Sequence, residues 1–102
     1  MPPLREFAAE FEREQGCTET EWLRWLPGAV REHALALPAP GQACVAIGDG
    51  QLWLRWTELP PRRIALIRMP RMRVEFRFDA VDAAGRAVFM QYFDLYLQRG
   101  GG

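Results

Sequence analysis

The chain has 102 residues, no net charge and a hydrophobic fraction of 49%, which fits one globular domain. Serine, asparagine and lysine are absent, all 13 basic residues are arginine, and His33 is the single histidine. These absences exclude or nearly exclude four classes. Serine hydrolases need a serine, Schiff-base enzymes and P-loop NTPases need a lysine, and His-rich metal sites need more than one histidine.

The charges are unevenly distributed along the chain. Residues 1–33 carry seven acids and four arginines, a net charge of −3, whereas residues 49–79 carry seven arginines and four acids, a net charge of +3. Such asymmetry is typical either of internal charge complementarity, which is the simpler interpretation, or of a surface that faces an anion.

Cys17 and Cys44 are the two cysteines of the chain. The sequence has no secretion signal and no apolar run long enough to span a bilayer, so we expect a cytoplasmic protein with no membrane partner and with reduced, buried thiols. A disulfide between the two cysteines is the alternative. Because two cysteines without a clustered histidine are too few for a structural zinc site, we expect neither a metal nor a cofactor.

The first third of the chain predicts helices. Prolines at positions 2 and 3 suit a helix start, and the apolar positions that follow recur at helical spacing up to a C-cap at Gly16. Thr18 and Glu21 fit a capping box for a short second helix, which Pro27-Gly28 interrupts. Residues 29–37 predict a helical turn and then an extended edge segment. The apolar stripe of the first helix comprises Leu4, Phe7, Ala8 and Phe11.

The middle of the chain predicts strands. Gly48-Asp49-Gly50 has the composition of a hairpin turn between the first two of them. Pro60-Pro61 is expected to end the second strand, and Pro70 is expected to add a bulge or turn after an apolar, central third strand. The expected strands are Ala43–Ile47, Gln51–Thr57, Arg63–Met69 and Arg71–Asp79.

Side chains alternate along two of these strands. In the second strand Leu52, Leu54 and Trp56 share one face, opposite Trp53, Arg55 and Thr57. Residues 71–79 alternate strictly, which predicts a half-buried antiparallel strand with one wet face. Its apolar side comprises Met72, Val74, Phe76 and Phe78, and its polar side Arg71, Arg73, Glu75, Arg77 and Asp79.

The last element is predicted to be a long helix. Asp82 can cap it, and its apolar band is widened by Val88, Leu95 and Leu97. We therefore expect a single α+β domain over residues 1–102, in which N-terminal helices and the C-terminal helix pack on one face of an antiparallel meander of about four strands. The helical stripe consists of Phe89, Tyr92, Phe93 and Tyr96.

Two stretches carry a resemblance to other sequences. Residues 54–66 (LRWTELPPRRIAL), together with the ending Phe93-Asp94-Leu95-Tyr96 and Gln98–Gly102, resemble small uncharacterised bacterial proteins of about this length. The resemblance implies a standalone one-domain protein and assigns no role to any residue.

The arginines of the predicted sheet are the first candidate site. If one sheet face is open, Arg55, Arg71, Arg73 and Arg77 can line it beside Trp53. Arginine binds phosphate through a bidentate fork and tryptophan stacks on bases, so this face is suited to single-stranded nucleic acid. The simpler alternative is a solvated face on which acids pair with the arginines and one arginine lies over Trp53. The neutral net charge also argues against nucleic-acid binding.

Three further features favour ordinary structure over chemistry. Gly100–Gly102 resembles the Gly-Gly tail of ubiquitin-like carriers, yet a helix end explains it more simply. His33 and Glu32 are adjacent in sequence and so point in different directions, which makes a poor catalytic dyad. Cys44, in mid-strand, is predicted to lie in the core, and Asp94 to face solvent or pair with an arginine.

The sequence thus predicts a binding protein. We expect a small accessory module that acts through protein–protein contacts, with a homodimer as its simplest assembly. Single-stranded nucleic-acid binding on the same face is the alternative, and a small enzyme with an arginine-lined anion pocket is the third hypothesis. The candidate binding residues are Trp53, Arg55, Arg71, Arg73 and Arg77.

Overall fold

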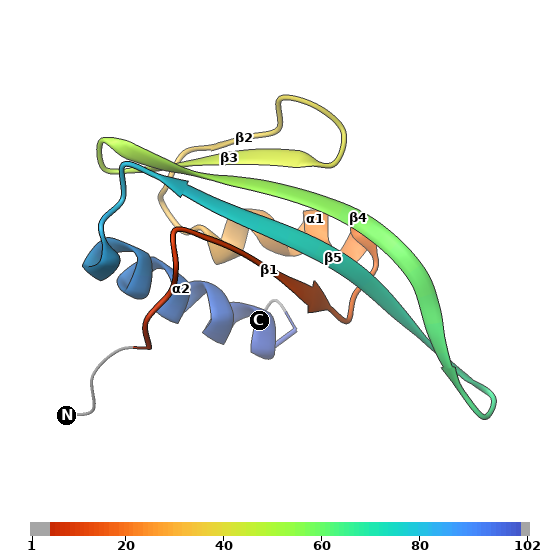
Figure 1. The fold of residues 1–102 in the computed structure, drawn as a ribbon. Coiled ribbons are helices and arrows are strands. Elements are labelled where there is room, and N and C mark those ends of the chain that lie inside the picture. Colours follow the sequence, from red (N-terminus) through yellow and green to blue (C-terminus); the bar gives the residue numbers. More distant parts are fainter. Residues whose placement is uncertain (1–4, 101–102) are drawn as a thin grey trace.

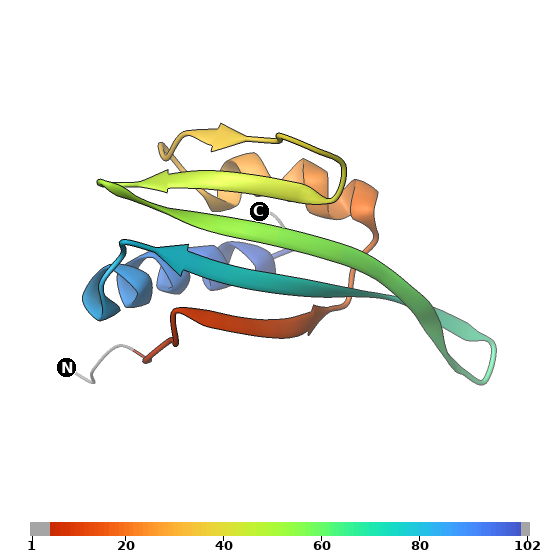
Figure 2. The ribbon, with the colours of Figure 1, turned by 45° about the horizontal axis from the view of Figure 1, so that its top comes forward.

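The structure, a computed structural model, describes residues 5–100. Within this range five strands form one antiparallel sheet in the order β1-β5-β4-β3-β2, and two helices cover one of its faces (Figures 1 and 2). This confirms an α+β architecture with a C-terminal helix, with five strands in place of about four. The elements are β1 (Glu10–Gln15), α1 (Glu19–Ala29), β2 (Leu35–Ala36), β3 (Gln42–Ile47), β4 (Gly50–Ile64), β5 (Ile67–Asp79) and α2 (Ala83–Gln98).

The N-terminal segment forms an edge strand, so the predicted first helix is wrong. β1 pairs antiparallel with β5, and Phe11 stacks on Phe76 with ring centroids 4.6 Å apart. Residues four apart share a face in a strand as well as in a helix, so the spacing of Phe7 and Phe11 fits both. The expected helix start, residues 2–4, lies outside the described residues.

The capping box of α1 is confirmed. Thr18 Oγ1 accepts a hydrogen bond from the Glu21 backbone N–H at 3.1 Å, and Glu21 Oε1 accepts one from the Thr18 N–H at 2.9 Å. The helix does not break at Pro27 but runs on to Ala29. Pro27 has no N–H to donate to the Leu23 carbonyl one helical turn earlier. Both residues are exposed, so water can donate the missing hydrogen bond.

Residues 30–50 confirm the expected turn, edge segment and hairpin. A turn after α1 leads to the two-residue edge strand β2, which pairs with Cys44 and Val45 of β3. β3 and β4 then form a hairpin in which Ile47 lies opposite Gly50. Gly48, in the turn between them, has a φ of 57°, a conformation that glycine adopts without steric cost.

β4 and β5 form one long hairpin, which corrects two expectations. β4 passes through Pro60-Pro61 to Ile64, and residues 63–69 form the end and turn of this hairpin instead of a central strand. The register shifts between Leu59 and Arg62, where β4 has two residues against Pro70 alone on β5. This bulge accommodates the prolines, which have no N–H for the ladder.

Helix α2 is capped as predicted, because Asp82 Oδ1 accepts a hydrogen bond from the Gly85 N–H at 2.8 Å. Its residues Val88 and Leu95 are 62% and 45% exposed and do not join the buried band. Asp94 forms an ion pair with Arg13 of β1, which is one of the two environments predicted for it, an arginine partner or solvent. This ion pair links α2 to the edge of the sheet.

The core lies between the sheet and the two helices. At its centre Trp22 of α1 makes edge-on contacts with Trp56 of β4 and Phe93 of α2, at centroid distances of 5.7 Å and 6.1 Å. Trp56 Nε1 donates a hydrogen bond to Glu19 Oε2 at 2.7 Å. The inner sheet positions are those predicted from the alternation, namely Leu52, Leu54, Trp56, Met72, Val74, Phe76 and Phe78.

Candidate functional site

The sheet face opposite the helices, called here the open face, carries the predicted binding residues. Alternation along β4 and β5 places them all on this side, because their neighbours in each strand are buried beneath the helices. Arg77 lies opposite Trp53 in the register, with its guanidinium carbon 6.0 Å from the indole centroid. The structure therefore groups Trp53, Arg55, Arg71, Arg73 and Arg77 on one surface.

Acids are interleaved with these arginines. β1 adds its outward glutamates to the open face, with Glu10 opposite Arg77 and Glu14 opposite Arg73. The carboxylate of Glu14 also accepts a hydrogen bond from Arg71 Nη1 at 3.1 Å. On the body of the sheet, outside residues 59–71, five acids face three arginines (Arg55, Arg73 and Arg77), so this surface is slightly acidic. The acids are Glu10, Glu12, Glu14, Glu75 and Asp79.

The open face is hollowed around Trp53. This hollow has a volume of about 440 Å³. Trp53 is half-buried in it, while Glu12 and Glu75 lie directly opposite each other in the register of β1 and β5. Like charges placed opposite each other across strands are destabilising unless a cation lies near them. The polar and aromatic side chains that line the hollow are Glu10, Glu12, Gln42, Trp53, Arg55, Glu75 and Arg77.

The far end of the β4–β5 hairpin extends beyond the rest of the sheet (Figures 1 and 2). We call residues 59–71 the arm. Four large aliphatic side chains are exposed at its tip. Leu66, in the turn, is fully exposed to solvent. Its neighbours Ile64, Ile67 and Met69 are 54%, 63% and 45% exposed.

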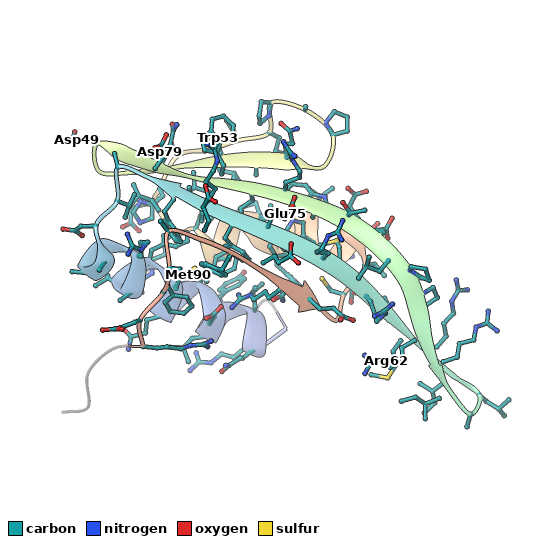
Figure 3. All side chains as sticks on the ribbon, in the orientation of Figure 1. Asp49, Trp53, Arg62, Glu75, Asp79 and Met90 are labelled. Carbon is teal, nitrogen blue, oxygen red and sulfur yellow. The ribbon has the colours of Figure 1, made fainter. Side chains whose placement is uncertain are left out.

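The arm is amphipathic across its two faces. The bulge lies in β4, so the side chains of β5 keep their alternation along the arm. Ile67 and Met69 therefore lie on the same side as Arg71 and Arg73 and continue the open face of the sheet. Ile64 and Arg62 lie opposite them in the register, whereas Arg63 and Arg68 pair on the other face. Figure 3 shows Arg62 on the projecting arm, far from Trp53 and Glu75. Residues 59–74 contain no acid, so the charge of the arm is unopposed within it.

Arg71 braces the arm against the body of the protein. Its Nε donates to the Pro60 carbonyl at 3.0 Å, and its Nη1 donates to Glu14. Arg71 therefore serves the structure at the base of the arm, unlike the other arginines of the predicted site. Sequence reasoning assigned the arm to a central strand and so missed it; the prolines at positions 60, 61 and 70 were the signal that this segment is unusual.

A second hollow, of about 450 Å³, lies between the end of α1 and the start of α2. Its lining is largely aliphatic and aromatic, and the imidazole Nδ1 of His33 at its rim is 3.0 Å from the Ala46 carbonyl oxygen. The His33 ring also packs edge-on against Phe89 at 5.5 Å. His33 is thus held by structural contacts, and Glu32 beside it is exposed.

The two cysteines lie in different environments and should react differently. Cys17 is buried, and burial, followed by the charge of Glu21, raises the pKa of its thiol to about 11. Cys44 lies opposite Trp53 on the open face and is half-buried, which corrects its prediction as a core residue. Both thiols are free.

We therefore expect Ellman's reagent to titrate Cys44 in the native protein at mildly alkaline pH, because its side chain reaches solvent. Cys17 should react only after denaturation. The measurement is the number of thiols released before and after adding guanidinium chloride, with Cys44→Ala as the control that should abolish the native reaction. Fast native reaction of the Cys44→Ala variant would contradict the burial of Cys17.

Among residues 5–100 no group of three His, Cys, Asp or Glu side chains is placed to hold a metal ion. Neither helix within that range has the length and apolarity of a membrane-spanning segment. Gly100, at a φ of 63°, ends α2 and donates to the Leu97 carbonyl at 3.0 Å. Gly101 and Gly102 of the predicted tail lie outside the described residues.

Comparison of the sequence with protein-family models finds no match, and comparison with curated proteins finds no significant similarity either.

Proposed function

We propose that the protein is a small self-associating binding module and that the arm is its contact element. The observation that carries this proposal is the exposure of four aliphatic side chains at the tip of an ordered hairpin. Exposed apolar clusters rimmed by polar residues mark sites of protein association, since their burial gains roughly 25 cal/mol per Å². Among the side chains of the arm, Ile64, Leu66, Ile67 and Met69 supply the apolar surface.

The chemistry of the arm favours a protein partner over nucleic acid. Its tip and one of its faces are aliphatic, and aliphatic side chains neither stack on bases nor bind phosphates. The open face contains the arginines and Trp53 that single-stranded nucleic acid would need, but its five acids would repel a phosphate backbone. The free thiols of Cys17 and Cys44 fit the cytoplasm, the compartment that we propose.

A second copy of the chain is the partner that the charges support best. The chain is neutral overall, yet its arm is purely basic and the rest of its open face is slightly acidic. Two copies can therefore satisfy each other's charges in a closed, two-fold assembly.

The proposal is tested by sedimentation velocity from low to high micromolar protein. We expect the wild-type protein to dimerise, and a Leu66→Glu, Ile67→Glu double variant to dissociate with a Kd raised at least about thirtyfold, as expected for a hot spot worth 2 kcal/mol or more. The matched control is Leu37→Glu, because Leu37 is 57% exposed but lies away from the arm.

The control variant should dimerise as the wild-type protein does. A wild-type protein that remains monomeric at all these concentrations would overturn self-association. A dimer that tolerates both arm charges would overturn the role of the arm. Circular dichroism of the double variant checks that its fold is intact, which we expect because both substituted side chains are exposed.

A further inference from the structure

We infer that the arm of one copy docks in the hollow around Trp53 on the open face of a second copy. This inference rests on the proposed self-association and adds the acceptor surface to it. Three observations support it: the charge of the hollow, the distance between the hollow and the arm of the same chain, and the continuity of the two surfaces.

The hollow has the chemistry to accept a basic, aliphatic ribbon. Its lining contains three acids and two arginines, whereas the arm has no acid and carries Arg62 on its open face, Arg71 at its base, and Arg63 and Arg68 on its other face. Within residues 5–100 neither Glu12 nor Glu75 forms an ion pair, although they lie opposite each other and Arg55 of β4 lies opposite Glu75. An arginine placed between these two carboxylates would relieve their repulsion. The half-buried indole of Trp53 offers an apolar surface for an aliphatic side chain.

The arm cannot reach the hollow of its own chain. Met69 and Arg77 lie on the same strand, eight residues apart, which corresponds to about 26 Å along an extended strand. The strand between them is held in the sheet by pairing with β4 and, for residues 72–77, with β1. An arm that fills such a hollow must therefore come from another copy.

The two surfaces lie on the same side of the sheet, which permits a two-fold arrangement. Along β5 the aliphatic tip and the hollow both belong to the open face, with Arg71 and Arg73 between them. If two copies pack with their open faces together and their β5 strands antiparallel, each arm lies over the other hollow. Near the axis Glu14 lies opposite Arg73 and accepts a hydrogen bond from Arg71 of its own chain, so it partly offsets the two arginines at the centre of the contact.

A native thiol beside Trp53 on the neighbouring strand allows a direct test. Cys44 lies opposite Trp53 in the register and is half-buried on the open face, whereas Cys17 is buried. We expect a Leu66→Cys variant to form a covalent dimer under mild oxidation, with its bond to Cys44 of the second copy identified by mass spectrometry of the digested dimer. Adding Cys44→Ala to this variant should abolish the cross-link. The matched control, which should not form it, is Val88→Cys, because Val88 is 62% exposed on α2 at the other face of the sheet.

A charge-reversal pair provides the second, independent measurement. Arg62→Glu on the arm and Glu12→Arg in the hollow should each raise the dimer Kd by about tenfold, the loss of roughly 1.4 kcal/mol. In a mixture of the two variants, the heterodimer has one native Arg62–Glu12 contact and one contact in which both charges are reversed. Both of its arm-to-hollow contacts are then complementary in charge, so the heterodimer should form more tightly than either variant associates alone. Both side chains are exposed, so neither change should unfold the protein.

The outcomes separate this inference from the proposed function. If the wild-type protein is monomeric, both fail. If it dimerises through the arm but the Leu66→Cys variant cross-links to itself after Cys44→Ala, the arms contact each other and only the acceptor assignment is overturned. If the mixture of the Arg62→Glu and Glu12→Arg variants associates no more tightly than each variant alone, the acceptor assignment is also overturned.

Discussion

Replacing Phe93 with alanine should destabilise the protein by about 3–5 kcal/mol, the usual cost of removing a buried aromatic ring. Phe93 has no exposed surface and joins both helices to the sheet. Its ring contacts Trp22, Phe76 and Phe89 at centroid distances of 6.1, 5.8 and 5.7 Å. Because small domains are stable by only about 5–15 kcal/mol, the variant should lose much of its stability. Urea denaturation followed by circular dichroism and tryptophan fluorescence measures the change.

Val88→Ala is the control for this prediction. Val88 lies on the same helix but is 62% exposed, so its truncation should change the free energy of unfolding by no more than about 0.5 kcal/mol. Equal denaturation midpoints for the Phe93→Ala and Val88→Ala proteins would mean that α2 does not pack on the sheet as described.

A single methyl group at Gly50 should destabilise the central hairpins by about 2–3 kcal/mol, as expected for overpacking against a rigid neighbour. A Cβ atom at this position would lie 2.2 Å from the Ala80 carbonyl oxygen and 2.5 Å from that of Asp79. Both atoms belong to the backbone, so β4 and the end of β5 would have to separate to admit the methyl group. Thermal denaturation of Gly50→Ala, monitored by circular dichroism, measures the effect as a lower melting temperature.

The matched control is Gly16→Ala. The nearest atom to a Cβ at Gly16 is the Pro70 carbonyl oxygen at 4.0 Å, an ordinary van der Waals distance. This variant should melt within a few degrees of the wild-type protein, because the added side chain restricts the unfolded chain without a clash in the fold. A Gly50→Ala protein that is as stable as Gly16→Ala would contradict the close approach of Gly50 to the Asp79-Ala80 backbone.

Local signals made several elements predictable from the sequence. The capping box at Thr18, the cap at Asp82 and the glycine turn after Ile47 each depend on residues that are near one another in the chain. The strict alternation of residues 71–79 fixed both the strand and its buried side. The grouping of Trp53 with the arginines on one face followed from the same alternation.

The errors arose where tertiary structure decides between two local patterns. Phe7 and Phe11 fit a helix and a strand equally, and the pairing of β1 with a strand more than fifty residues away determined the outcome. Once β1 was assigned to a helix, its glutamates could not be placed on the open face. Residues 63–69 are apolar enough for a central strand, but their burial depends on neighbouring strands that end before reaching them. The projecting arm was therefore not predictable from composition.

The prolines of the arm also bear on aggregation. An exposed aliphatic ribbon with free edges is normally a template for strand addition and cross-β stacking. Here Pro60 and Pro61 interrupt the outer edge of β4 beyond its pairing with β3, and Pro70 interrupts β5 beyond its pairing with β1. None of the three has an N–H, so this stretch offers fewer donors to an added strand. The arm can thus present its side chains to a partner through one face while its edges resist fibrillar growth.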